Sequence, residues 1–156
     1  MRKFLKVAAL VLVLALAMSV FAGCGKSKTA EETYFFTYDV LKAEKVSDFD
    51  GIKPTEGKML LAVTVSIENT FGEDIPMFDT DFQVQWGPGD DDFAVTLEAS
   101  SDKQLPESYT LADKETRKGI LLYEVPADLT DFTLAYLEFF DDQTTGDFYE
   151  IAFQAK

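Results

Sequence analysis

The sequence predicts an all-β sandwich of about seven to eight short strands, preceded by an N-terminal leader. Three observations lead to this prediction. Apolar and polar side chains alternate with a period of two in several segments, as they do in strands with one buried face. Glycine and proline turn signals separate these segments. No stretch after the leader sustains the period of an amphipathic helix.

The chain begins with a leader that is typical of exported proteins. A basic head, MRKFLK, precedes residues 7–21, in which Ser19 is the only polar side chain. A transmembrane helix needs roughly 20 apolar residues, whereas a run of 15 suits the apolar region of a signal peptide. The sequence Ala22-Gly23-Cys24 then resembles the lipobox of bacterial lipoproteins. We therefore predict a lipoprotein signal peptide over residues 1–23 and a polar tether over residues 24–33.

Cys24 is the only cysteine of the chain. The lipobox resemblance implies that its thiol is acylated, for example with palmitate, and that it becomes the new N-terminus. Two acyl chains hold a protein stably on a membrane, because each buried methylene contributes about 0.8 kcal/mol. We therefore expect membrane lipid as a partner and the extracytoplasmic face of the cell membrane as the location. The alternative is an ordinary signal peptide that leaves Cys24 as a free thiol.

Composition excludes several classes of function. Removal of residues 1–23 takes away three of the 14 basic groups and none of the 28 acidic groups, which leaves a net charge of −17. A chain so acidic is not expected to bind nucleic acid, whose phosphates require lysine and arginine. The absence of histidine excludes Ser-His-Asp and Cys-His catalysis and every imidazole metal site. We expect no cofactor.

Alternation predicts the strands in chain order. Residues 35–46 are rich in strand formers. MLLAVTVSIEN is the clearest segment, because every second residue from Met59 to Ile67 is apolar. FQVQW repeats the pattern and places Trp86 in the core. The segment FAVTL follows, and we expect its Phe93, Val95 and Leu97 to point into the core. The later strands are GILLYEVP, FTLAYLEFF and FYEIAFQ.

Turns and one polar segment account for the rest. Turn signals lie at residues 71–74, 87–90 and 144–147, where glycine is combined with acidic residues, threonine or proline. Residues 99–118 are polar and are expected to hold at most one short strand, near Tyr109.

Four segments together resemble a family of bacterial lipoproteins that carry a single immunoglobulin-like domain of unknown function. These segments are EGKMLLAVTVSIENT, DTDFQV, RKGILLYEVPAD and FTLAY. The resemblance implies an immunoglobulin-like β-sandwich over residues 34–156, a lipid anchor and an exported setting, commonly in a Gram-positive bacterium. The chain departs from the family at Asp113-Lys114, where Pro-Gly is usual. The resemblance carries no catalytic residues.

Acidic loops are the first candidate site. Asp90, Asp91 and Asp92 follow a Gly-Pro-Gly turn, and Asp48 and Asp50 lie in another loop. Carboxylates in loops can bind calcium, but the spacing here does not fit an EF-hand and three adjacent aspartates cannot all face one ion. We therefore expect these residues to form a solvated turn, and Asp90, Asp91 and Asp92 are only weak candidates for calcium ligands.

Adjacent aromatic residues are the second candidate. Neighbours in a strand point to opposite faces of a sheet, so one member of each aromatic pair should leave the core unless residues 99–118 cover it. Exposed aromatic patches mark partner or ligand surfaces. The expected contact residues, one from each pair, are Phe36, Phe140 and Phe148.

Together these observations predict a non-catalytic binding or interaction module of unknown protein or small-ligand partner. Paired carboxylates could in principle cleave glycosides, but nothing in the spacing selects a pair. The alternative is a structural or accessory subunit of an exported enzyme or transport complex. A binding module should show an aromatic patch or a pocket, whereas an accessory subunit should show a flatter and larger apolar face.

Overall fold

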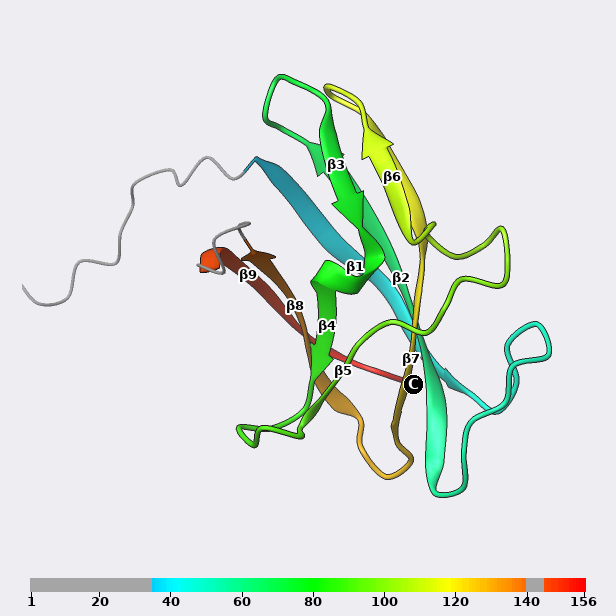
Figure 1. Cartoon of the computed structure of the whole chain (residues 1–156). Helices are drawn as coiled ribbons and strands as arrows, with labels where there is room; N and C mark the ends of the chain where they lie inside the picture. The colour runs from blue at the N-terminus through cyan, green and yellow to red at the C-terminus, as the bar shows by residue number, and fades with distance from the viewer. Residues whose placement is uncertain (1–34, 140–144) are drawn as a thin grey trace, which may run out of the picture. The chain divides into compact units, whose positions relative to one another are not determined.

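Nine strands and one short 3-10 helix account for the fold of residues 35–139 and 145–156, which are the residues that the computed structural model describes (Figure 1). No helix in these residues is long and apolar enough to cross a membrane. In chain order the elements are β1 (Phe36–Val46), β2 (Lys58–Asn69), β3 (Ile75–Phe78), η1 (Asp79–Asp81), β4 (Phe82–Gln85), β5 (Phe93–Ala94), β6 (Ser108–Leu111), β7 (Thr116–Pro126), β8 (Asp131–Phe139) and β9 (Thr145–Gln154).

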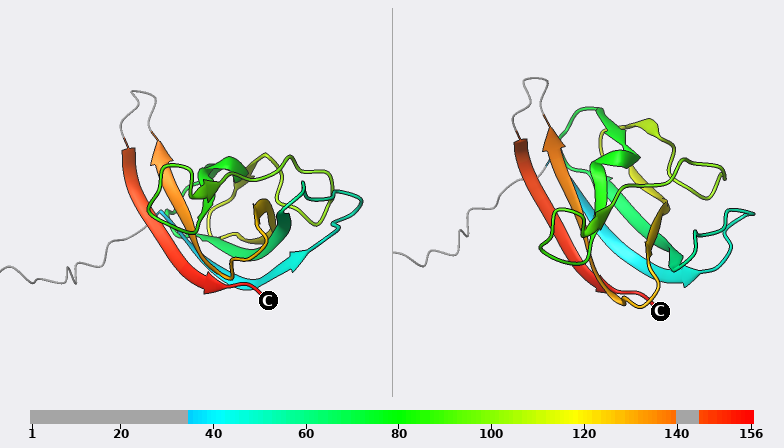
Figure 2. Two further views of the ribbon diagram at one scale, coloured as in Figure 1. Left: turned by 90° about the horizontal axis from the view of Figure 1, so that it is seen from below. Right: turned by 60° about the horizontal axis from the view of Figure 1, so that its bottom comes forward.

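The strands form three antiparallel sheets. One sheet has the order β1-β2-β7, a second has the order β5-β4-β8-β9, and β3 pairs with β6. Figure 2 shows β8 and β9 as two long, paired strands along one side of the domain. The chain passes from the β3–β6 pair to the four-stranded sheet through η1, which joins β3 to β4 directly. The all-β prediction is therefore confirmed. The two strands that η1 joins, β3 and β4, are each only four residues long.

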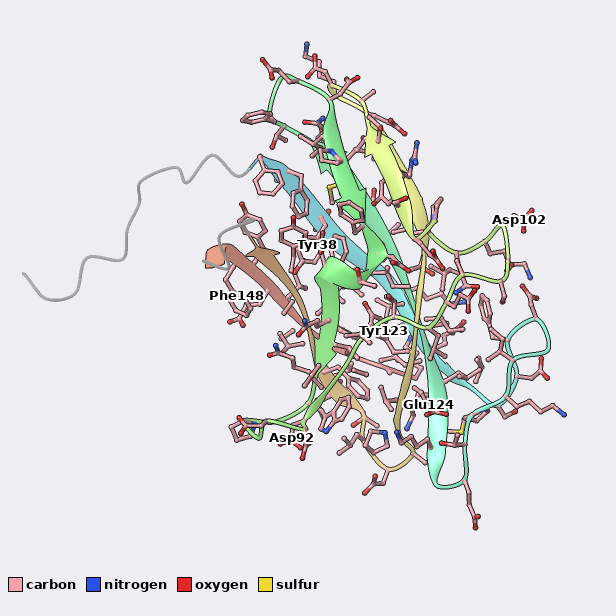
Figure 3. All side chains as sticks on the ribbon, in the orientation of Figure 1. Tyr38, Asp92, Asp102, Tyr123, Glu124 and Phe148 are labelled. Carbon is pink, nitrogen blue, oxygen red and sulfur yellow. The ribbon has the colours of Figure 1, made fainter. Side chains whose placement is uncertain are left out.

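The core lies between the three-stranded and the four-stranded sheet. The alternation predicted for β2 is confirmed, because Leu61, Val63, Val65 and Ile67 are all fully buried. Two tyrosines join the sheets: the Tyr123 hydroxyl donates to the Phe82 carbonyl at 3.1 Å, and the Tyr38 hydroxyl lies 2.8 Å from the Leu134 carbonyl (Figure 3). Burial raises the pKa of both tyrosines, so their hydroxyls remain protonated donors.

The polar segment before β7 runs along the edge of that strand that does not pair with β2. Leu105 is buried against Gly119, and its N–H donates to the Ile120 carbonyl at 3.0 Å. A Cβ atom at Gly119 would lie 2.7 Å from Leu105 Cδ2, so a larger residue here would force the Leu105 side chain to shift. The short strand predicted near Tyr109 is β6.

The prediction for FAVTL is wrong. Phe93 and Val95 are exposed, and Leu97 is half-buried. β5 is an edge strand of only two residues, and the chain then leaves the sheet, so that the Leu97 N–H donates to Leu122 of β7 at 2.7 Å. Trp86 is half-buried at the margin of the core. β3 was not expected at all, because a four-residue strand that contains proline gives little alternation to detect.

Candidate functional site

A buried amide shapes the loop between β2 and β3. Asn69, the last residue of β2, is 1% exposed, and its Nδ2 donates to the carbonyls of Glu73 at 2.8 Å and Leu111 at 2.9 Å. Its Oδ1 accepts the N–H of Phe71 at 2.9 Å. Gly72 has a φ of 93°, a conformation that glycine adopts without steric cost. These contacts fix a loop whose Phe71 side chain is 59% exposed.

Phe71 forms one wall of a hollow that we call the aromatic groove. Phe78, which is 47% exposed, forms another wall, because alternation along β3 turns Met77 inward and Pro76 and Phe78 outward. The groove has a volume of about 440 Å³. It is lined by Phe35, Phe71, Ile75, Pro76, Phe78, Asp81 and Tyr136.

The base of the aromatic groove is continuous with the core. Tyr136 packs edge-on against Phe36 at 4.6 Å between ring centroids and against Phe35 at 6.0 Å. Phe36 in turn packs against Phe82, at 6.1 Å. Edge-to-face aromatic contacts of this kind contribute beyond the apolar area that they bury. The groove therefore has a rigid, apolar base and two exposed aromatic walls.

One carboxyl group lies in this apolar setting. Asp81 ends η1 and lines the aromatic groove. Partial burial raises the pKa of Asp81, and the neighbouring carboxylate of Asp79 raises it further. Because a partly desolvated carboxylate is stabilised by an opposite charge, the groove favours a ligand that carries both apolar and cationic groups.

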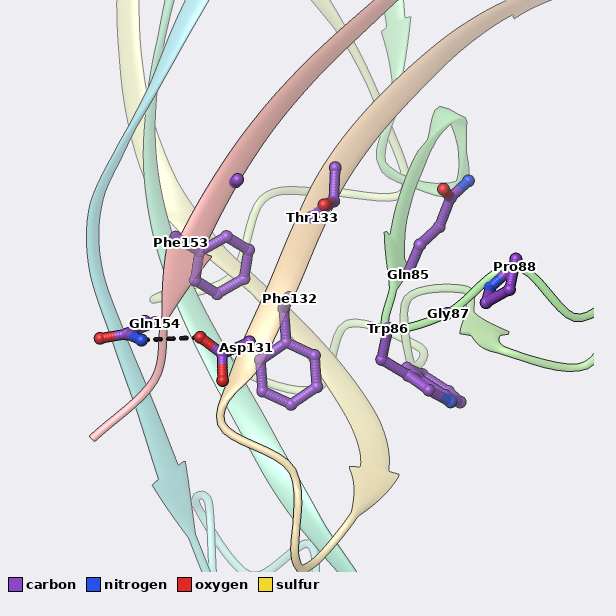
Figure 4. A pocket seen from close by; sticks show the side chains of 10 residues that line it. Gln85, Trp86, Gly87, Pro88, Asp131, Phe132, Thr133, Phe153 and Gln154 are labelled. Atoms are coloured by element: carbon purple, nitrogen blue, oxygen red, sulfur yellow. Dashed lines mark hydrogen bonds between the residues drawn. The ribbon is translucent and has the colours of Figure 1, made fainter.

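A larger hollow of about 640 Å³ lies on β4, β8 and β9 (Figure 4). Asp131 lies at one end and accepts hydrogen bonds from Gln154 at 2.6 Å and Thr130 at 3.0 Å. The hydrogen bond from Gln154 is the main cause that lowers the pKa of Asp131. The polar groups at this end are thus paired with one another, which favours a role in holding the ends of β8 and β9 together.

Comparison with known proteins identifies the family. The sequence model of one protein family, DUF4352, matches residues 22–145, and this family is described as a domain of unknown function. The chain belongs to this family. The resemblance that the strand motifs indicated is thereby confirmed. No curated protein matches the chain.

A solved structure supports the fold of this DUF4352 chain. It is the crystal structure of YcdA from Bacillus subtilis, a protein assigned as a lipoprotein, and it is 16% identical with a TM-score of 0.57. The match covers 75% of the DUF4352 chain and 36% of YcdA. The chain therefore spans about a third of the length of YcdA, and the likeness shows the fold alone.

The aromatic residues predicted to contact a partner have different positions in the DUF4352 domain. Phe36 is 1% exposed, so the prediction of an accessible ring there is wrong: β1 turns Phe36 into the core and leaves Phe35 half-buried at the aromatic groove. Phe148 points outward from β9 (Figure 3), while its neighbour Tyr149 is buried. Phe140 and Cys24 lie outside the described residues. Phe71 and Phe78 were missed, although an aromatic residue inside the turn FGED was a usable signal.

The acidic loops mostly make local hydrogen bonds. Asp92 Oδ2 accepts the Gly89 N–H at 2.9 Å, and Asp48 Oδ1 accepts the Gly51 N–H at 3.0 Å. Asp50 pairs with Lys103 at 2.7 Å. Within residues 35–139 and 145–156, no group of three or more carboxylate, thiol or imidazole side chains is placed to hold a metal ion. The calcium hypothesis for Asp90, Asp91 and Asp92 gains no support from this geometry.

Proposed function

We propose that the protein is a lipid-anchored extracytoplasmic lipoprotein whose β-sandwich is a non-catalytic binding module. Its ligand is a segment of a protein partner that carries apolar and basic side chains. The leader and Cys24 support the anchor. The assignment of YcdA as a lipoprotein points in the same direction.

The aromatic groove is the observation that carries the binding proposal. Hydrogen bonds hold the backbone beneath its two exposed phenylalanines: the Asn69 amide holds Phe71, and the pairing of β3 with β6 holds Phe78. Recognition surfaces typically combine concave apolar walls with a few polar groups, and rigid aromatic side chains supply much of their binding energy. Phe71 and Phe78 lose little conformational freedom when a partner covers them, because the backbone on which they stand is already held.

Charge favours a basic partner. The chain has a net charge of −14 with its leader, and Asp81 stands inside the aromatic groove. A strongly negative surface attracts cationic segments and speeds their association, and this attraction weakens as salt is added. The apolar walls then supply contact area that salt does not screen.

The alternative role of an accessory subunit receives less support. Such a subunit should present a broad apolar face, but the large apolar side chains that are exposed in the described part of the chain are scattered over several elements. Of these, Phe71 and Phe78 share one hollow. Their arrangement favours a narrow recognition groove.

Site-specific photo-crosslinking in the native cell tests the proposal. A benzophenone analogue of phenylalanine replaces Phe71 in the full-length protein, and Phe93 serves as the matched control because it is an exposed phenylalanine outside the aromatic groove. We expect one protein adduct from position 71, through a segment of net positive charge, and its loss when Phe78→Ser is added. Equal adducts from positions 71 and 93, or lipid adducts alone, would contradict the proposal.

A further inference from the structure

A buried carboxylate stands where the chain changes sheets. Asp79 begins η1, immediately after β3, and is 4% exposed. Its N–H donates to the Glu107 carbonyl at 3.2 Å, which ties the start of η1 to the residue before β6. The side-chain oxygen Oδ1 of Asp79 is buried and has no hydrogen-bond partner in the described part of the protein. A buried acceptor in this state costs free energy unless a ligand or solvent supplies a donor.

Asp79 lines a hollow that we call the acidic pocket, which has a volume of about 560 Å³. Burial is the main influence on Asp79 and raises its pKa, whereas the Thr96 hydroxyl and the Thr80 N–H lower that pKa in part. Thr96 also lines the acidic pocket, and its buried hydroxyl makes no hydrogen bond of good geometry with the described residues. The complete lining comprises Phe78, Asp79, Thr80, Thr96, Glu98, Glu107 and Ser108.

The charge of the acidic pocket is not offset by basic side chains. Its lining contains three carboxylates and no lysine or arginine. Two basic side chains outside the lining have partners of their own: Lys103 pairs with Asp50 at 2.7 Å, and Arg117 pairs with Glu115 at 2.8 Å. Phe78 closes one side with a ring that is half exposed, and the face of such a ring attracts cations within about 6 Å.

We infer that the acidic pocket binds an organic cation with a primary ammonium or guanidinium group. Such a group offers several N–H donors, which match the free oxygen of Asp79 and the hydroxyl of Thr96, while Glu98 and Glu107 attract it from the exposed mouth. The described residues lack the cluster of three or more ligands that would favour a metal ion. The acidic pocket shares Phe78 with the aromatic groove but does not require that the groove bind a partner.

Calorimetric titration of the full-length protein, purified from membranes in detergent, tests the inference. The probes are n-butylammonium and n-butylguanidinium, with n-butanol as the neutral control and calcium as the metal control. We expect saturable binding of at least one cationic probe and none of n-butanol. Asp79→Asn should weaken binding by about tenfold or more, as expected for the loss of a charge-assisted hydrogen bond.

Two further variants keep the test decisive. Thr96→Val should weaken binding several-fold without a change in charge. Asp102→Asn should leave binding unchanged, because Asp102 is exposed in the β5–β6 connection (Figure 3) and is not part of the pocket lining. The inference is overturned if neither cationic probe binds the wild type, if n-butanol binds as well as the cations do, or if calcium binds in place of both cationic probes. It is also overturned by equal binding to wild type and Asp79→Asn, or by an equal loss in Asp102→Asn. Urea unfolding of each variant shows whether it is folded. A failed titration would leave the crosslinking result at position 71 unaffected, so the two proposals can fail separately.

Discussion

Replacement of Asn69 by alanine should both destabilise the domain and loosen the aromatic groove. The amide is 1% exposed and serves two elements, since it holds the β2–β3 loop through Phe71 and Glu73 and holds the end of β6 through Leu111. Asn69→Ala removes these hydrogen bonds at once. It also leaves the Leu111 carbonyl without this donor at a buried position.

The number of hydrogen bonds that Asn69→Ala removes gives the expected loss in the free energy of unfolding. Nδ2 has two hydrogens for three carbonyls, because Ala112 lies at 3.1 Å in addition to the Glu73 and Leu111 carbonyls, and Oδ1 accepts one further bond. Three effective bonds at about 1 kcal/mol each suggest a loss of about 3 kcal/mol in the free energy of unfolding. That loss is a large part of the 5–15 kcal/mol typical of a domain. It corresponds to a fall in Tm of roughly 10 °C.

Urea unfolding followed by tryptophan fluorescence measures this loss, and the slope with denaturant should stay the same. Gln154→Ala is the matched control, because it removes an exposed amide that bonds to Asp131 at 2.6 Å, and it should cost less than about 1 kcal/mol. If Asn69→Ala cost no more than Gln154→Ala, the loop would not depend on the buried amide, and the account of how Phe71 is presented would be wrong.

Three further predictions concern the anchor, the packing and the buried carboxylate. Cys24→Ser should abolish incorporation of labelled palmitate and release the protein from membranes, whereas retention of label would place the acyl chain elsewhere. Gly119→Ala should destabilise the domain by about 1–3 kcal/mol, because its Cβ would collide with Leu105, and the penalty should fall in a Leu105→Ala background. Asp79→Asn should be more stable than wild type at pH 7: a raised pKa means that ionisation costs the folded state free energy, so wild-type stability falls as the pH rises through that pKa. This difference in stability between Asp79→Asn and wild type should vanish below the ordinary pKa of aspartate, about pH 3.9. A difference that is constant with pH would contradict a raised pKa of Asp79.

The long strands could be predicted from the sequence because their burial pattern is local. Every second residue of β2 from Leu61 to Ile67 is buried in one sheet face, and the sequence shows this alternation directly. Phe93 and Val95 alternate equally well but are exposed, because pairing stops after two residues of β5. Alternation shows which residues share a face, but it does not show whether another layer covers that face.

The site was harder to predict because its parts meet only in the folded chain. The aromatic groove combines Phe35, Phe71, Phe78 and Tyr136, which come from four separate parts of the sequence. The role of Asn69 depends on the carbonyl of Leu111, 42 residues later. The sequence did indicate that aromatic residues would be left at the surface, but the register of β1 decided that Phe36 is inside and Phe35 lies at the groove.

Amide hydrogen exchange on the full-length protein tests most directly whether the aromatic groove is the recognition surface. Exchange is compared between the protein in its native membranes and the same protein purified in detergent. A bound partner should slow exchange in residues 70–78 and leave residues 86–94, around Trp86 and Phe93, unchanged. Equal exchange of residues 70–78 in both preparations, or slowing confined to residues 86–94, would contradict the proposal that the aromatic groove is the recognition surface.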